Sequence, residues 1–176
     1  FVKNQAFLTD SLLINVATIA IDTSKIKSDQ FLKKGDIIIA DASEGYEDIG
    51  KSIEIISLDN QKVVSGLHTL HAKSKNKIYL GFGSFLMKCP STKKSLMMIA
   101  QGSKVLGISY KRVSQISLYL PCLQEQQRIT DFLTAVDKRI ELLEKKKTLL
   151  ETYKKGVMKK IFNQEIRFKD DNGNEF

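Results

Sequence analysis

The chain is poor in the residues that build metal centres, disulfides and membrane spans. Its 176 residues include two cysteines, two histidines and no tryptophan, and neither cysteine belongs to a CxxC pair. This excludes a disulfide framework and disfavours a structural zinc site. No apolar run approaches the roughly 18 residues of a membrane span, so we expect a cytoplasmic protein with no membrane contact. Cys89 and Cys122 lie in apolar sequence contexts, where we expect inert core thiols.

Acidic residues are missing from one long stretch. The whole chain has 28 Lys and Arg against 20 Asp and Glu, a net charge of +8, and none of the acids lies between Asp59 and Glu125. Because no carboxylate cancels the basic side chains of this tract, it keeps a positive potential. A phosphate backbone is the natural partner for such a surface. A lysine-rich surface that only keeps the protein soluble would have the same composition.

The first 120 residues alternate short strand-like and helical patterns. A β-branched run after Gly35-Asp36 predicts a buried strand. The other predicted strands lie at 53–58, 63–70, 78–88 and 116–120, and a buried-looking run lies at 12–21. Ser91–Gln101 predicts a helix, and Tyr110–Gln115 a single helical turn. We therefore expect an α+β fold: a small globular domain with a twisted mixed β-sheet and short helices.

The last third of the chain predicts one long amphipathic helix, from just after Pro121 to about Phe162. At 1.5 Å per residue it would be roughly 58 Å long. A 3.5-residue apolar period is typical of a coiled coil, and we expect an antiparallel partner helix. Eight of the ten positions in this helix-pairing seam are apolar: Ile129, Leu133, Val136, Ile140, Leu143, Lys147, Leu150, Lys154, Val157 and Ile161.

Patterns typical of catalysis are weak. His68 and His71 have no carboxylate or nucleophile near them in the sequence, so we interpret them as DNA-facing or structural residues. Four carboxylates share one loop, where two of them could hold a divalent ion as in nucleases, although a solvated loop is the plainer interpretation. These are Asp41, Glu44, Glu47 and Asp48. We expect no cofactor and no metal in this chain.

Residues suited to nucleic-acid recognition are better represented. Charged tips can hold phosphates, while short polar and aromatic side chains can read base edges. Three glycine-containing loops, at 41–51, 66–77 and 102–112, permit close approach to DNA. The predicted DNA-binding residues are Ser43, Tyr46, Lys51, His68, Thr69, His71, Lys73, Lys75, Lys77, Lys104, Ser109, Tyr110, Lys111 and Arg112.

Four segments resemble the specificity subunits of type I restriction–modification enzymes. Residues 120–129, with their Pro, Glu-Gln and Ile, are similar to the signature that opens the conserved helix of that family, and 150–162 resemble its end. Upstream, 34–40 resemble the Gly-Asp strand motif of the family, and 102–109 resemble its glycine-serine loop. The resemblance covers most of the chain and is most specific in the helix.

The resemblance implies a non-catalytic subunit for sequence-specific DNA recognition. A full subunit of this family has two target-recognition domains, each followed by a helix, and the two helices pair antiparallel. Each domain reads half of a split site. Modification subunits dock on the helices and methylate adenine, and restriction subunits add ATP-driven translocation and cleavage.

On this basis we interpret the chain as half of a specificity subunit. Residues 1–121 would be the target-recognition domain, 122–163 the spacer and dimerisation helix, and 164–176 a tail leading toward an absent second domain. The expected partners are double-stranded DNA, modification subunits, restriction subunits through the complex, and a second copy through the seam. The alternative is a divalent-metal-dependent nuclease or other DNA-processing enzyme. A third interpretation, a purely structural coiled-coil adaptor, would not bind duplex DNA.

Overall fold

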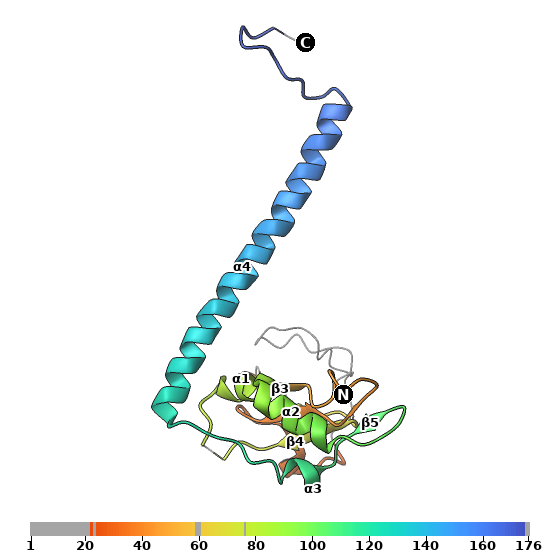
Figure 1. Cartoon of the computed structure of the whole chain (residues 1–176), viewed down its shortest axis with the longest axis vertical. Coiled ribbons are helices and arrows are strands. Elements are labelled where there is room, and N and C mark those ends of the chain that lie inside the picture. The colour runs from red at the N-terminus through yellow and green to blue at the C-terminus, as the bar shows by residue number, and fades with distance from the viewer. Residues whose placement is uncertain (1–21, 23, 59–60, 76, 175–176) are drawn as a thin grey trace. The chain divides into compact units, whose positions relative to one another are not determined.

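The computed structural model describes residues 22, 24–58, 61–75 and 77–174. Contacts divide the chain into two compact units, residues 1–132 and 133–176, and each is described by itself. The expected α+β class is confirmed, with short strands and helices in the first unit and one long helix, α4 (Leu123–Phe162), beginning there (Figure 1). The predicted buried run at 12–21 lies outside the described residues.

Two small antiparallel sheets lie in the described part of the first unit. β1 (Ile37–Ala40) is the central strand of the larger sheet, between β3 (Ser52–Glu54) and β4 (Thr69–Ala72). The smaller sheet pairs β2 (Ala42–Ser43) with β5 (Leu106–Gly107). The expectation of a mixed sheet is wrong for the described strands. Among the described residues between β1 and β4, no α-helix makes the crossover that a parallel pair needs.

β1 has a continuous apolar sequence because both of its faces are buried. Ile37 and Ile39 point to one side, where they belong to the main core with Met87, Leu96 and three further buried apolar residues. Ile38 points to the other side, where it packs with Leu32 and Ile55. Alternation of side chains across a strand explains this division.

In the part of the chain that the structure describes, four short helical segments accompany the sheets. They are η2 (Ser28–Gln30), α1 (Phe82–Lys88), α2 (Pro90–Ile99) and α3 (Tyr110–Val113). The helices predicted at 91–101 and 110–115 are therefore confirmed. The strand predicted at 78–88 is wrong, because its second half is α1. The strand predicted at 116–120 is also wrong, because this alternating segment finds no partner strand among the described residues.

The strand predicted at 63–70 is displaced toward the C-terminus. A turn at Leu67 and His68 delays its start, so β4 begins at Thr69 and ends at Ala72, within the loop expected at 66–77. The core thiols are a further correction, since Cys89 and Cys122 are both exposed. Cys89 lies at the junction of α1 and α2, where the Ser91 hydroxyl lies 3.2 Å from its sulfur and lowers its pKa.

A buried carboxylate explains why α1 forms where a strand was expected. Glu54, on β3, accepts hydrogen bonds from the backbone N–H groups of Gly81 at 2.7 Å and Ser84 at 2.8 Å. These are free donors at a helix N-terminus, which a carboxylate satisfies. Burial raises the pKa of Glu54, and the hydrogen bonds offset that rise only in part. The first turn of α1 is thus attached to the sheet.

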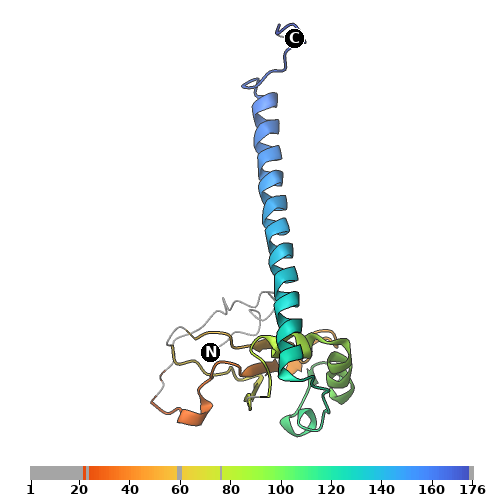
Figure 2. The same ribbon diagram turned by 90° about the vertical axis from the view of Figure 1, so that its left-hand side faces the viewer.

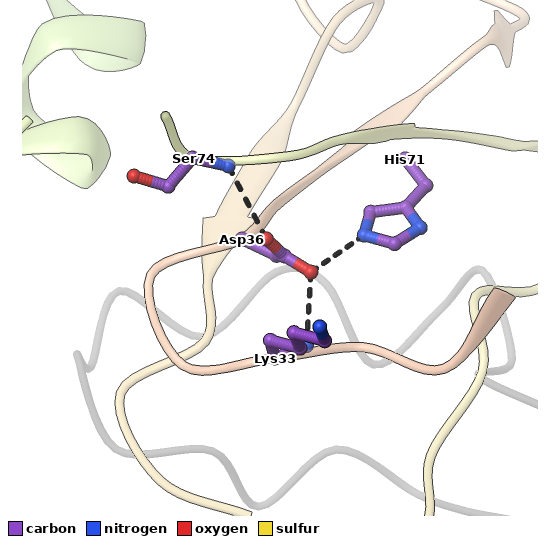
Figure 3. Close-up of polar contacts among 4 residues, drawn as sticks. All are labelled: Lys33, Asp36, His71 and Ser74. Carbon is purple, nitrogen blue, oxygen red and sulfur yellow. Dashed lines mark hydrogen bonds and ion pairs between the residues drawn. The ribbon is translucent and has the colours of Figure 1, made fainter. Parts of the chain in front are cut away.

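A second buried carboxylate joins the start of β1 to the end of β4 (Figure 3). Asp36 accepts hydrogen bonds from His71 Nε2 at 2.7 Å, from the Lys33 N–H at 2.9 Å and from the Ser74 N–H at 3.2 Å. Burial raises the pKa of Asp36, but these hydrogen bonds outweigh it, and the pKa is lowered. The network therefore holds the beginning of the basic segment that follows β4.

The start of α4 is attached to the first unit through Gln126, which is only 1% exposed. Its side-chain oxygen accepts the Tyr79 N–H at 2.8 Å, and its amide nitrogen donates to the carbonyls of Pro121 at 2.9 Å and Lys77 at 3.2 Å. The long helix predicted from the sequence is confirmed, and Figure 2 shows it unbroken. Its first turns therefore belong to the globular unit.

We predict that Gln126→Leu lowers the free energy of unfolding by about 2 kcal/mol or more, because it leaves the Tyr79 N–H and two carbonyls without their partner. Urea unfolding monitored by circular dichroism measures this change. Gln127→Leu is the matched control, because Gln127 is exposed in the same helical turn, and its effect should stay within about 0.5 kcal/mol. Equal effects of the two substitutions would contradict this role of Gln126.

We also predict a pH-dependent cost for Asp36→Asn. A carboxyl whose pKa is lower in the folded state stabilises the fold above its ordinary value of 3.8, and the stabilisation is lost as the pH falls through the lower folded value. The variant should be less stable than the wild type by about 1–3 kcal/mol near pH 6. That gap should shrink below pH 3.8. Glu54 titrates in both proteins, so its contribution cancels. A gap independent of pH would refute the assignment.

Candidate nucleic-acid interface

An open groove of about 550 Å³ lies where the three predicted loops meet. Pairing of β2 with β5 sets Ala42 opposite Gly107 and so joins the first loop to the third. The Ile108 N–H donates to the Asp41 carbonyl at 2.8 Å, and the Asp41 N–H donates to the His68 carbonyl at 3.3 Å. Backbone hydrogen bonds thus hold segments that are far apart in the sequence around one site. The groove is lined by Asp41, Ala42, His68, Gln101, Gly107, Ile108, Ser109 and Arg112.

Three side chains give the groove its charge. His68 is exposed, and Arg112 is partly buried, with its Nη1 donating to the Ile99 carbonyl at the end of α2 at 3.1 Å. The Asp41 side chain is 26% exposed, and its Oδ1 lies 3.8 Å from His68 Nδ1, too far for a hydrogen bond. The groove therefore combines one fixed cation, one imidazole and one carboxylate.

The predicted DNA-binding residues divide into groups by position. His68, Ser109 and Arg112 line the groove together. Ser43 and Thr69 are engaged in local turns: the Ser43 hydroxyl accepts the Gly45 N–H at 3.2 Å, and the Thr69 hydroxyl donates to the Gly66 carbonyl at 2.6 Å. Tyr46 and Tyr110 are exposed.

The predicted phosphate-binding lysines are mostly free of acidic neighbours. Lys51 is paired with Asp48 at 2.6 Å. The remaining five are exposed, and no carboxylate of the described residues pairs with them: Lys73, Lys75, Lys77, Lys104 and Lys111. Their charge is therefore available to a polyanion.

His71 has a partner inside the domain. Its side chain is 13% exposed, and Nε2 bonds to Asp36, so a DNA contact for His71 stays a prediction. Asp36 lies 35 positions from His71 and Asp41 lies 27 positions from His68, so neither carboxylate could be assigned to a histidine from neighbouring residues. The antiparallel register of β1 and β4, which sets Ile38 opposite His71, brings these groups together.

The loop carboxylates considered for a nuclease lie in different surroundings. Asp41 lines the groove, Asp48 pairs with Lys51, and Glu44 and Glu47 are exposed. Among residues 22, 24–58, 61–75 and 77–174, no three His, Cys, Asp or Glu side chains converge in a metal-binding arrangement. None of the described helices combines the length and the apolar composition that crossing a bilayer requires.

Comparison with known proteins agrees with the resemblance seen in the helix. The family model for the type I restriction modification DNA specificity domain matches residues 2–152. Among solved structures, the chain is similar to the crystal structure of a type-I restriction-modification system S subunit from M. genitalium, with 18% sequence identity and a TM-score of 0.46. That match covers 72% of this chain and 32% of the M. genitalium chain, so it spans about a third of the longer protein. Because the family match extends over most of the sequence, the chain belongs to the type I restriction modification DNA specificity domain family.

Proposed function

We propose that this chain recognises one half of a split DNA target and thereby directs adenine methylation and restriction by partner subunits. Its family is one of DNA sequence recognition; the half-site, the methylation and the partners are the parts that we propose. The chain needs no cofactor of its own for this role. Methylation and cleavage would come from the modification and restriction subunits.

The observation that carries the proposal is the meeting of three loops in one polar groove, two of which come from the tract without acids. Residues 41–42, 68 and 101–112 contribute to the groove. Exposed lysines without carboxylate partners lie in the same sequence tract. Phosphate contacts fix a protein on a duplex, whereas side chains in a groove between loops can read base edges. This combination supports DNA recognition over a lysine-rich surface that only keeps the protein soluble.

We further propose that residues 1–121 form the recognition domain, 122–163 the spacer helix and 164–176 a connecting tail. The compact units divide at residue 132 instead, because Gln126 attaches the first turns of α4 to the globular unit. Such an attachment fixes where the helix starts relative to the segment that ends at Lys77. A spacer helix requires a fixed start if it is to set a distance.

The second unit presents apolar side chains that suit partner helices. On the seam, Val136, Ile140, Leu143 and Leu150 are between 40% and 56% exposed. A second exposed stripe, formed by Leu142, Leu149 and Tyr153, lies beside it. Large exposed apolar stripes mark interaction surfaces. We propose that the seam pairs with a second copy of the chain and that the second stripe contributes to docking of a modification subunit.

The lysine contribution can be tested with a mixed-sequence duplex. For the triple substitution Lys73→Ala, Lys75→Ala and Lys77→Ala, we predict a slope of log K against log salt that is shallower by about 2 to 3, because each lost phosphate contact removes about 0.9. Fluorescence anisotropy between about 50 and 200 mM salt measures it. Alanine at Lys155, Lys159 and Lys160, all exposed on α4, is the control and should leave the slope unchanged.

Two results would count against the proposal. An equal loss of slope in both triple variants would show that the basic tract has no special part in binding. Cleavage of the duplex by the purified chain after addition of Mg²⁺, which should not occur, would favour the nuclease interpretation. Loss of that cleavage in Asp41→Asn or Glu44→Gln would then locate it in the loop carboxylates.

The pairing surface can be tested by sedimentation. We predict that Leu150→Glu raises the dissociation constant of the dimer by at least about 10-fold, because a carboxylate would be buried on the seam. Thr148→Glu places the same side chain at an exposed position outside the seam and should leave the dissociation constant unchanged. A wild-type chain that sediments as a monomer at micromolar concentration would contradict self-association.

A further inference from the structure

We propose that Asp41 is a specificity-determining residue that accepts a hydrogen bond from the exocyclic amino group of a base, cytosine N4 or adenine N6, in the major groove. The inference rests on the proposed function and adds to it the chemical class of ligand read at one position. Asp41 was considered from the sequence only as a ligand for a divalent ion. The structure places it in the groove with the residues predicted to contact DNA.

The backbone of Asp41 is fixed from two sides. Its N–H donates to the His68 carbonyl at 3.3 Å, and its carbonyl accepts the Ile108 N–H at 2.8 Å. The residue also lies between β1 and β2, each of which is paired with another strand. A side chain that reads a base must be held in place before the duplex arrives. The backbone of Asp41 is held in this way, because segments from the other two loops bond to its peptide groups.

The carboxylate of Asp41 lacks the hydrogen bonds that the buried acids Asp36 and Glu54 have. Those two each accept at least two from within the domain. The Oδ1 atom of Asp41 is itself buried, and among the described residues it is the one buried side-chain nitrogen or oxygen without a hydrogen-bond partner. A buried acceptor without a donor costs free energy, and such atoms call for an explanation such as a ligand.

The charge of Asp41 selects the kind of ligand. A phosphate would be repelled by the carboxylate, so the group bound beside it must be a hydrogen-bond donor. In the major groove of duplex DNA, the base donors are the amino groups of cytosine and adenine, and aspartate accepts from such groups. Arg112, on the same groove, is the cation that can hold the adjacent backbone. The base amino group and the adjacent phosphate would thus be bound by two residues of one groove, Asp41 and Arg112.

The variant Asp41→Ala is the direct test, because it removes both acceptor oxygens of the side chain. Asp48→Ala is the matched control: it makes the same change in the same loop, at an exposed residue paired with Lys51. The full chain is first used to select duplexes from a randomised library. For the wild type and the Asp48 variant we expect the same preferred sequence. For the Asp41 variant we expect the preference to be lost at one position and kept at the others.

A second measurement identifies the atom that is read. The selected duplex is remade with a base that lacks only the amino group, 2-pyrimidinone for cytosine or purine for adenine. We expect the analogue at the read position to weaken wild-type binding by about 10-fold or more and to leave binding of the Asp41 variant unchanged. The analogue that weakens binding of the wild type but not of the variant shows whether the base read is cytosine or adenine. Any effect of the analogue on the duplex itself is common to both proteins and cancels.

The outcomes separate this inference from the proposed function. Equal penalties for the analogue in the wild type and the Asp41 variant, with duplex binding intact, would overturn the role of Asp41 alone. A second outcome would be a uniform loss of affinity for every duplex, together with a lower unfolding midpoint in both Asp41→Asn and Asp41→Ala. It would show that Asp41 only stabilises the fold, through its contact with His68. A wild-type chain that binds no duplex at low salt would overturn the inference and the proposed function together.

Discussion

The short backbone pairing of β2 with β5 is the contact on which the candidate interface depends. It is only two residues long on each side, yet it joins the loop after β1 to the loop before α3. Hydrogen bonds from Asp41 to His68 and from Ile108 to Asp41 add the segment before β4. Without this pairing, the same side chains would lie on three separate loops. The backbone hydrogen bonds therefore form the groove, and the polar side chains that line it determine which groups it can bind.

Buried carboxylates fix the elements around that pairing. Glu54 attaches α1 to β3, and Asp36 attaches the segment after β4 to the start of β1. Gln126 has the corresponding part at the start of α4, where it bonds to backbone groups of Lys77 and Tyr79. In each case, a buried polar side chain satisfies backbone groups that would otherwise lack partners. The fold uses side chains where its strands are too short to supply those bonds.

The sequence predicted the parts of the structure that depend on local periodicity. The α4 helix follows from a long repeating apolar pattern, and β1 follows from a β-branched run that is buried on both faces. α1 was mistaken for a strand because its main signal, Glu54, lies 27 positions upstream of Gly81. The partners of His68 and His71 were missed for the same reason. Contacts set by strand register cannot be read from neighbouring residues. The family was recognisable because the start of α4 carries a local motif, and Gln126 of that motif is the residue buried at its base.

Amide hydrogen exchange of the chain with and without its selected duplex tests the central claim most directly. The claim is that DNA lies over the groove formed by the three loops. The account predicts that the duplex slows exchange at residues 41–45, 66–75 and 102–112, with little change in the exposed middle of α4. Slower exchange confined to residues 133–162, with the three loops unaffected, would contradict it.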